Sequence, residues 1–125
     1  MASPAMPATV LIIEDNEDSR VIMSVWLEHA GYRVVLARDG VCGVALARSI
    51  MPSVILMDVA LPDMDGWTAA RTLRDDPLTR HIPIIALTAM ALPQDAELAC
   101  KAGVALYLPK PVSLTRVLES VQQVL

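Results

Sequence analysis

The sequence contains no phenylalanine, only two cysteines, and an aromatic content of 3%. The cysteines, Cys42 and Cys100, lie far apart and form no CxxC pair, so neither a disulfide framework nor a zinc site is indicated. No run of roughly 18 apolar residues lacks a charge, which excludes a transmembrane helix by the usual length criterion. The N-terminus has no lysine or arginine ahead of its short apolar run, unlike a signal peptide. We therefore expect a cytoplasmic protein.

Positive charge is also scarce, because ten lysines and arginines face fourteen acidic residues and the net charge is -4. Such a chain has no general basic field, so neither nucleic acid nor a membrane is expected as a direct partner. Hydrophobic residues reach 54%, which excludes wholesale disorder, and 125 residues correspond to one domain. We predict a flexible leader over residues 1–8 and a single domain over residues 9–125, with no effector domain after Leu125.

Five short apolar runs alternate with stretches of helix length. The runs occupy residues 9–13, 32–36, 54–57, 84–87 and 105–108, and they are mostly aliphatic without polar alternation. Uninterrupted runs of this kind predict parallel strands that are buried on both faces. The alternation predicts an α/β fold with an open, doubly wound, five-stranded parallel sheet and five helices on its two faces.

Side chains spaced by three and four residues share one face of the first and last helices, and we expect these faces to pack on the sheet. The first helix has Ile22, Val25, Trp26 and His29 on this face. The last helix has Leu114, Val117, Leu118, Val121 and Leu125 there. Gly31 and Gly103 are expected to end the first and fourth helices.

Polar side chains follow four of the five predicted strands. Glu14 and Asp15 follow the first strand, Asp58 the third, Thr88 the fourth and Lys110 the fifth. In an open parallel sheet, ligands bind outside the carboxyl ends of the strands, where the winding direction reverses. We therefore expect these five side chains to meet in one crevice.

Three carboxylates in one crevice repel each other unless they take up a proton or a cation. Oxygen ligands without histidine or cysteine favour a hard ion, and open coordination positions suit Mg²⁺. With a lysine and a threonine opposite, the crevice suits a phosphoryl group, and Asp58 on the middle strand is the candidate nucleophile. Pro111 follows Lys110, and a cis bond between them would direct the ammonium into the crevice.

Four sequence fragments carry a family resemblance. They are V-L-I-I-E-D-N-E-D-S-R at 10–20, L-M-D-V-A-L-P-D-M-D-G at 56–66, A-L-T-A at 86–89 and Y-L-P-K-P at 107–111. In this order and spacing, the chain resembles the CheY-like receiver domain of two-component response regulators. It is similar both to single-domain regulators and to the receivers of hybrid histidine kinases. The resemblance implies a flavodoxin-like fold with strand order 2-1-3-4-5.

The resemblance also implies roles for the residues of the crevice. Asp58 would accept a phosphoryl group from a histidine kinase or a histidine phosphotransfer protein. Asp15, Asp58 and the backbone carbonyl of Ala60 would bind Mg²⁺ directly, and Glu14 would act through a water. Lys110 would pair with Asp58 or with the phosphoryl group.

A conformational switch is implied in the same way. Thr88 would move inward to bond a phosphoryl oxygen, and Tyr107 would rotate inward with it. A downstream protein would then bind the surface of the fourth helix, fifth strand and fifth helix. The protein would be a signalling phosphoacceptor that catalyses only its own phosphorylation and dephosphorylation, not an enzyme acting on other substrates.

Three alternatives come from other classes of protein. A haloacid-dehalogenase-type phosphatase also uses a strand-end aspartate with Mg²⁺, but it needs a second acid where this chain has Ala60. A flavodoxin-like FMN binder needs a Ser/Thr-rich phosphate loop after the first strand, and none is present here. A degenerate receiver that only mediates protein contacts stays open as the alternative function.

Other polar residues near these fragments receive simpler interpretations. Asp63 and Asp65 are expected to be turn and cap residues, and Arg20 a solvated side chain. Ala60 and Met90 cannot hydrogen-bond an attacking water through their side chains. We therefore expect slow self-catalysed dephosphorylation.

Overall fold

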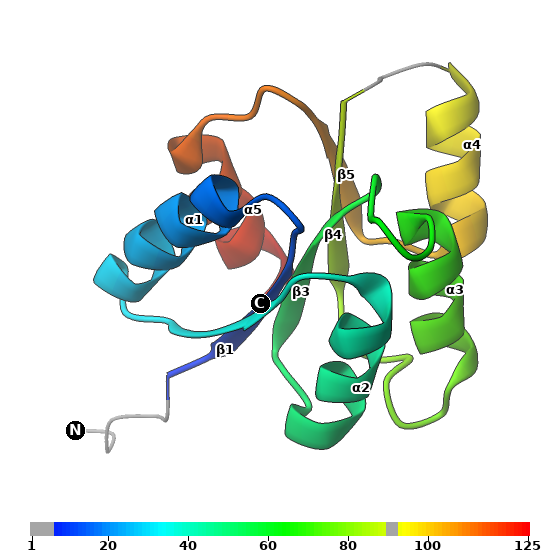
Figure 1. The fold of residues 1–125 in the computed structure, drawn as a ribbon, viewed down its shortest axis with the longest axis horizontal. Coiled ribbons are helices and arrows are strands. Elements are labelled where there is room, and N and C mark those ends of the chain that lie inside the picture. Colours follow the sequence, from blue (N-terminus) through cyan, green and yellow to red (C-terminus); the bar gives the residue numbers. More distant parts are fainter. Residues whose placement is uncertain (1–6, 90–92) are drawn as a thin grey trace.

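The computed structural model describes residues 7–89 and 93–125, without the side chains of 93–95. Within these residues, five strands form one sheet in the order β2-β1-β3-β4-β5, and every neighbouring pair is parallel. The strands are β1 (Thr9–Ile13), β2 (Arg33–Ala37), β3 (Val54–Asp58), β4 (Ile84–Thr88) and β5 (Leu106–Pro109). Figure 1 shows this sheet at the centre of the molecule. The predicted doubly wound sheet is confirmed.

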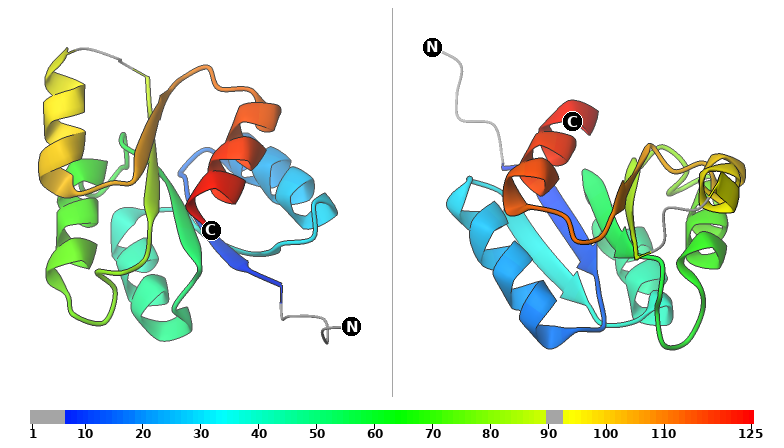
Figure 2. Two further views of the ribbon diagram at one scale, coloured as in Figure 1. Left: turned by 180° about the vertical axis from the view of Figure 1, so that it is seen from behind. Right: turned by 90° about the horizontal axis from the view of Figure 1, so that it is seen from above.

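Helices cover both faces of the sheet. They are α1 (Glu17–His29), α2 (Gly40–Ile50), α3 (Gly66–Asp75), α4 (Pro93–Ala102) and α5 (Leu114–Val124). Figures 1 and 2 show α1 and α5 on one face and α2, α3 and α4 on the other. Alternate strand residues point to opposite faces, so Val10 and Ile12 pack under α1 and α5, while Leu11 and Ile13 pack under the other three helices.

The prediction of which face of α1 packs on the sheet is wrong. Ile22, Val25 and Trp26 are 50%, 58% and 46% exposed, and His29 is exposed as well. Met23 and Leu27 pack on the sheet instead. The helix carries apolar residues on both sides, so periodicity alone could not decide which side faces the sheet.

The expected face of α5 is largely right. Val117 and Val121 are buried, and Leu114 and Leu118 are half-buried against the same core. Leu125 lies beyond the helix and is 50% exposed.

The strand boundaries differ from the predicted ones by one residue at several ends. Hydrogen-bond register, and not the apolar run, sets where a strand ends. Asp58 pairs with Leu87 and Thr88 pairs with Pro109, so these two polar residues are the last residues of β3 and β4. Gly31 and Gly103 have φ values of 100° and 75° and end α1 and α4, as predicted.

Among the described residues, no helix is both long enough and apolar enough to cross a bilayer. The cytoplasmic location stays a prediction. The leader predicted over residues 1–8 lies mostly outside the described residues and also stays a prediction.

Candidate functional site

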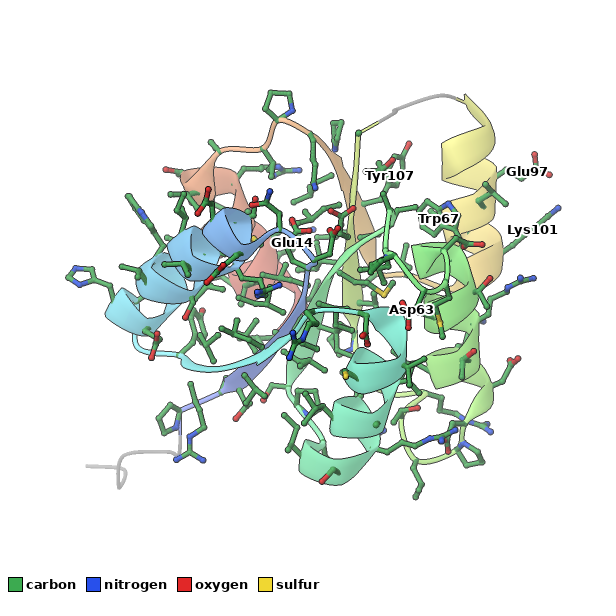
Figure 3. All side chains as sticks on the ribbon, viewed as in Figure 1. Glu14, Asp63, Trp67, Glu97, Lys101 and Tyr107 are labelled. Atoms are coloured by element: carbon green, nitrogen blue, oxygen red, sulfur yellow. The ribbon has the colours of Figure 1, made fainter. Side chains whose placement is uncertain are left out.

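The carboxyl ends of the strands bring the predicted acidic residues together. Glu14 and Asp15 directly follow β1, and Asp58 is the last residue of β3. One carboxylate oxygen from each of the three lies within 4.8 Å of the others. Figure 3 shows Glu14 at this edge of the sheet. Residues distant in sequence therefore form one acidic cluster, because β1 and β3 are neighbours in the sheet.

Lys110 enters the same cluster from the end of β5. Its Nζ lies 2.6 Å from Asp58 Oδ2 and 3.5 Å from Glu14 Oε1. The Lys110–Pro111 peptide bond is cis, as proposed from the sequence. Partial burial acts to lower the pKa of Lys110, but its bond to Asp58 and the charge of Glu14 outweigh burial and raise it. The side chain therefore stays a cation at neutral pH.

Glu14 is the most perturbed acid of the site. The residue is 1% exposed, and its pKa is raised to about 7 by burial and by its hydrogen bond and charge repulsion with Asp58. Lys110 acts in the opposite direction but does not compensate. The cluster therefore carries more negative charge than Lys110 balances.

These oxygen donors fit Mg²⁺. The three carboxylates offer only hard oxygen ligands, and no histidine or cysteine belongs to the cluster among the described residues. The raised pKa of Glu14 indicates that a cation would relieve the repulsion.

The segment that follows Asp58 folds back on the strand. Gly66 N donates to Val59 O at 2.7 Å, and Ala60 and Asp65 form an isolated bridge. A Cβ on Gly66 would lie 2.6 Å from Val59 Cα, so only glycine allows this close approach. Ala60 N donates to Asp58 Oδ1 at 2.9 Å, which orients the Asp58 carboxylate.

Asp63 and Asp65 serve as cap residues, as predicted from the sequence. Asp65 accepts from Thr68 N at the start of α3. Asp63 accepts from Gly40 N and Val41 N, so it caps α2, a helix far away in sequence.

Thr88 lies on β4, the strand beside β3, and Tyr107 lies on β5, the strand beyond it. Thr88 is buried at the end of β4. Tyr107 is half-buried on β5, pairs with Ala86 and packs against the core under α3 and α4 (Figure 3). Met90 lies outside the described residues.

Arg20 makes contacts at the site that the sequence did not predict. We expected a solvated side chain, but Arg20 Nη1 donates to Glu14 O at 2.8 Å and to Asp15 O at 3.1 Å. The side chain reaches back from the first turn of α1 to the segment that carries the acidic pair. In the sequence, this contact is marked only by an arginine five residues after Asp15. Arginines at such positions are common on exposed helices, so the sequence did not predict the contact.

An apolar cavity of about 480 Å³ adjoins the acidic cluster. Glu14 and Lys110 line it together with Ile22 and Met23 of α1 and Leu114 of α5. The site is therefore open to the surface between α1 and α5.

Residues 10–122 match the response regulator receiver domain family. The chain therefore belongs to this family of two-component signalling proteins, and the fold is the flavodoxin-like receiver fold that the resemblance implied. Family membership favours signalling over the phosphatase and flavin-binding alternatives.

Individual relatives cover nearly the whole chain. The polar-differentiation response regulator DivK of Brucella anthropi is 38% identical over 120 residues, which are 96% of this chain and 98% of DivK. Chemotaxis response regulator CheY4 of Vibrio cholerae matches with a TM-score of 0.90 and 31% identity over 95% of this chain and 99% of CheY4. A sensor histidine kinase receiver domain from Pseudomonas aeruginosa PAO1 matches with a TM-score of 0.86 and 38% identity, covering 94% and 96% of the two chains. That structure has a magnesium ion coordinated in its active-site cleft.

Proposed function

We propose that this receiver domain accepts a phosphoryl group on Asp58 from a phosphohistidine of a histidine kinase or a histidine phosphotransfer protein. The observation that carries the proposal is the contact of 2.6 Å between Lys110 Nζ and Asp58 Oδ2, beside two further carboxylates at the sheet edge. The ammonium holds the Asp58 carboxylate in place for attack, and family membership supports the same role.

In the proposed step, a carboxylate oxygen of Asp58 forms a bond to phosphorus while the bond from phosphorus to the imidazole nitrogen breaks. The electron pair of that bond returns to the histidine ring, and the product on Asp58 is an acyl phosphate. Lys110 stabilises the charge on the phosphoryl oxygens. Asp15, Asp58, the Ala60 carbonyl and Glu14, the last through a water, would hold Mg²⁺, which supplies positive charge to those oxygens when bound.

Phosphorylation adds charge and three acceptor oxygens beside Thr88 and Lys110. We infer that the Thr88 hydroxyl then bonds a phosphoryl oxygen and that Tyr107 turns inward toward the space it leaves. The change would favour a second conformation of the surface formed by α4, β5 and α5, which a downstream protein would bind. Signalling in the cytoplasm by this route is part of the same proposal.

The rival function is a receiver that binds partners without being phosphorylated. Purified protein is incubated with acetyl phosphate and Mg²⁺, and the intact mass is measured. A gain of one phosphoryl group supports the proposal, and an unchanged mass at all donor concentrations supports the rival.

We infer that the donor protein docks on the α1 outer face, defined by Val21, Ile22, Val25 and Trp26. These four side chains are between 46% and 58% exposed, and Ile22 also lines the cavity beside Glu14. Single exposed apolar residues are ordinary, but a continuous apolar helix face next to the reaction site fits an apolar partner surface. A donor that brings its phosphohistidine to Asp58 would contact this face.

Val25→Glu is expected to lower the rate of phosphotransfer by about tenfold when the donor is a histidine kinase that labels the wild type. The change places a charge in the apolar contact, whereas labelling by acetyl phosphate is expected to stay unchanged. Leu78→Glu is the matched control, since Leu78 is 61% exposed between α3 and β4, at the opposite end of the sheet from Asp58. Equal transfer rates for both variants would contradict docking on α1.

Ala60→Asn is expected to shorten the lifetime of the phosphoryl group by about tenfold. Ala60 is exposed two residues after Asp58 and offers no side-chain hydrogen bond to an attacking water, whereas an asparagine amide does. The decay of the phosphorylated form is followed by intact mass after the donor is removed. Ala60→Leu serves as the control of similar bulk, and a lifetime unchanged or lengthened in Ala60→Asn would refute this explanation.

A further inference from the structure

Two charged residues outside the acidic cluster hold the chain segments that follow β1 and β3. Each does so through hydrogen bonds to backbone groups. We propose that Arg20 and Asp63 are positioning residues for the Mg²⁺ site, one holding the β1–α1 segment and the other the β3–α3 segment. The inference rests on the proposed function, because it concerns the same metal site. It assigns a task to two side chains that neither ligate the metal nor contact the phosphoryl group.

Arg20 holds the segment with Glu14 and Asp15 from α1. Its Nη1 donates to both of their backbone carbonyls, at 2.8 and 3.1 Å. The other end of the segment is fixed by Glu14 N, which donates to Ala37 O at 3.0 Å, and by Asn16, which caps α1 through Ser19 N. Fixing the two peptide planes fixes the directions in which both carboxylates leave the backbone. A guanidinium suits this task because its planar Nη1 carries two N–H groups in fixed directions, one for each carbonyl.

Asp63 ties the segment after Asp58 to the start of α2. Oδ1 accepts from Gly40 N and Oδ2 from Val41 N, each at 2.8 Å. The local cap of α2, Asp39, accepts from Cys42 N. The first two amides of α2 therefore bond a carboxylate from 22 and 23 residues away. These two backbone bonds lower the pKa of Asp63, so its charge is present at neutral pH.

Helix α2 touches both metal-binding segments through glycines. A Cβ on Gly43 would collide with the side chain of Ile13, the residue before Glu14. A Cβ on Gly40 would collide with Met64, the residue after Asp63. The helix therefore packs closely on β1 and on the β3–α3 segment together. Figure 3 shows Asp63 at the end of α2 and apart from Glu14, which agrees with a support role.

The test is the Mg²⁺ affinity of the purified protein, measured by isothermal titration calorimetry. Arg20→Met and Asp63→Ala are each expected to weaken Mg²⁺ binding by about three- to tenfold, near the lower limit for groups that orient metal ligands. The chain offers a matched control pair of the same residue types. Arg48 and Asp76 form an ion pair of 2.6 Å between the C-terminal ends of α2 and α3, at the opposite edge of the sheet. Arg48→Met and Asp76→Ala are expected to bind Mg²⁺ like the wild type.

Conservative variants distinguish positioning from general loss of structure. Arg20→Lys and Asp63→Asn keep part of the hydrogen bonding, so each is expected to recover part of the Mg²⁺ affinity. In EDTA, amide hydrogen exchange of residues 59–65 is expected to rise in Asp63→Ala and not in Asp76→Ala. Wild-type affinity in both Arg20→Met and Asp63→Ala, or equal weakening in the control pair, overturns this inference and leaves the proposed function standing. A wild type that binds no Mg²⁺ overturns both.

Discussion

Replacing Asp58 with asparagine is expected to abolish phosphoryl uptake, with labelling reduced at least about a thousandfold. Asparagine has nearly the shape of aspartate, but its amide oxygen is a poor nucleophile and forms no acyl phosphate. The ion pair with Lys110 is lost at the same time. The measurement is the intact mass after incubation with acetyl phosphate and Mg²⁺, followed by peptide mapping of the labelled wild type.

Asp65→Asn is the matched control for this experiment. Asp65 belongs to the same β3–α3 segment and is exposed, but its carboxylate caps α3. The control is expected to take up one phosphoryl group at the wild-type rate. A label that persists in Asp58→Asn, or that maps to another residue in the wild type, would show that the acceptor is wrongly assigned.

The second large effect concerns Glu14 and pH in the metal-free protein. The pKa of Glu14 is about 7 in the folded state against 4.5 for an ordinary glutamate, so the folded state holds its proton more tightly than the unfolded state. The stability contributed by protonated Glu14 is fully present below pH 4.5 and is lost as the pH rises through about 7. The full shift corresponds to about 3 kcal/mol, and water in the adjoining cavity reduces the expected loss to about 2 kcal/mol.

This loss is measured by urea unfolding in EDTA between pH 4.5 and 8, with Glu14→Gln beside the wild type. Glutamine imitates the protonated acid, so the difference between the two proteins removes the contributions of all other titrating groups. The wild type is expected to fall below Glu14→Gln progressively as the pH rises. Parallel curves for the two proteins would refute the raised pKa.

Added Mg²⁺ is expected to restore the stability of the wild type above pH 7, because a bound cation balances the carboxylate charge that the lost proton leaves behind. Glu14→Gln is expected to gain less stability from Mg²⁺ than the wild type. The melting temperature with and without Mg²⁺ at pH 8 checks this. An equal gain in both proteins would contradict a role of Glu14 in Mg²⁺ binding.

The alternation of strands and helices was predictable because buried parallel strands are apolar throughout, and this pattern is local in the sequence. The strand order came from the family resemblance. The same reasoning located Glu14, Asp58, Thr88 and Lys110, since each stands where an apolar run stops. Parallel strands end at a common edge, so their convergence followed from topology. The structure confirms that Glu14, Asp58 and Lys110 meet there.

The orientation of α1 was not predictable in the same way. Both the face with Ile22, Val25 and Trp26 and the face with Met23 and Leu27 are apolar. Burying the second face on the sheet leaves the first exposed. Only the packing of the complete sheet selects between two faces of similar hydrophobicity.

By itself, the sequence determined the fold class, the edge of the sheet that holds the site and the chemical types gathered there, because these follow from periodicity and from which residues stand at strand ends. The tertiary structure alone decided how the site is supported. Arg20 bonds two backbone carbonyls, and Asp63 caps a helix that begins more than twenty residues before it. Nearly every residue carries the same backbone N–H and C=O groups, so no residue type in the sequence marks a contact to them. Such contacts depend on where the folded chain places these groups.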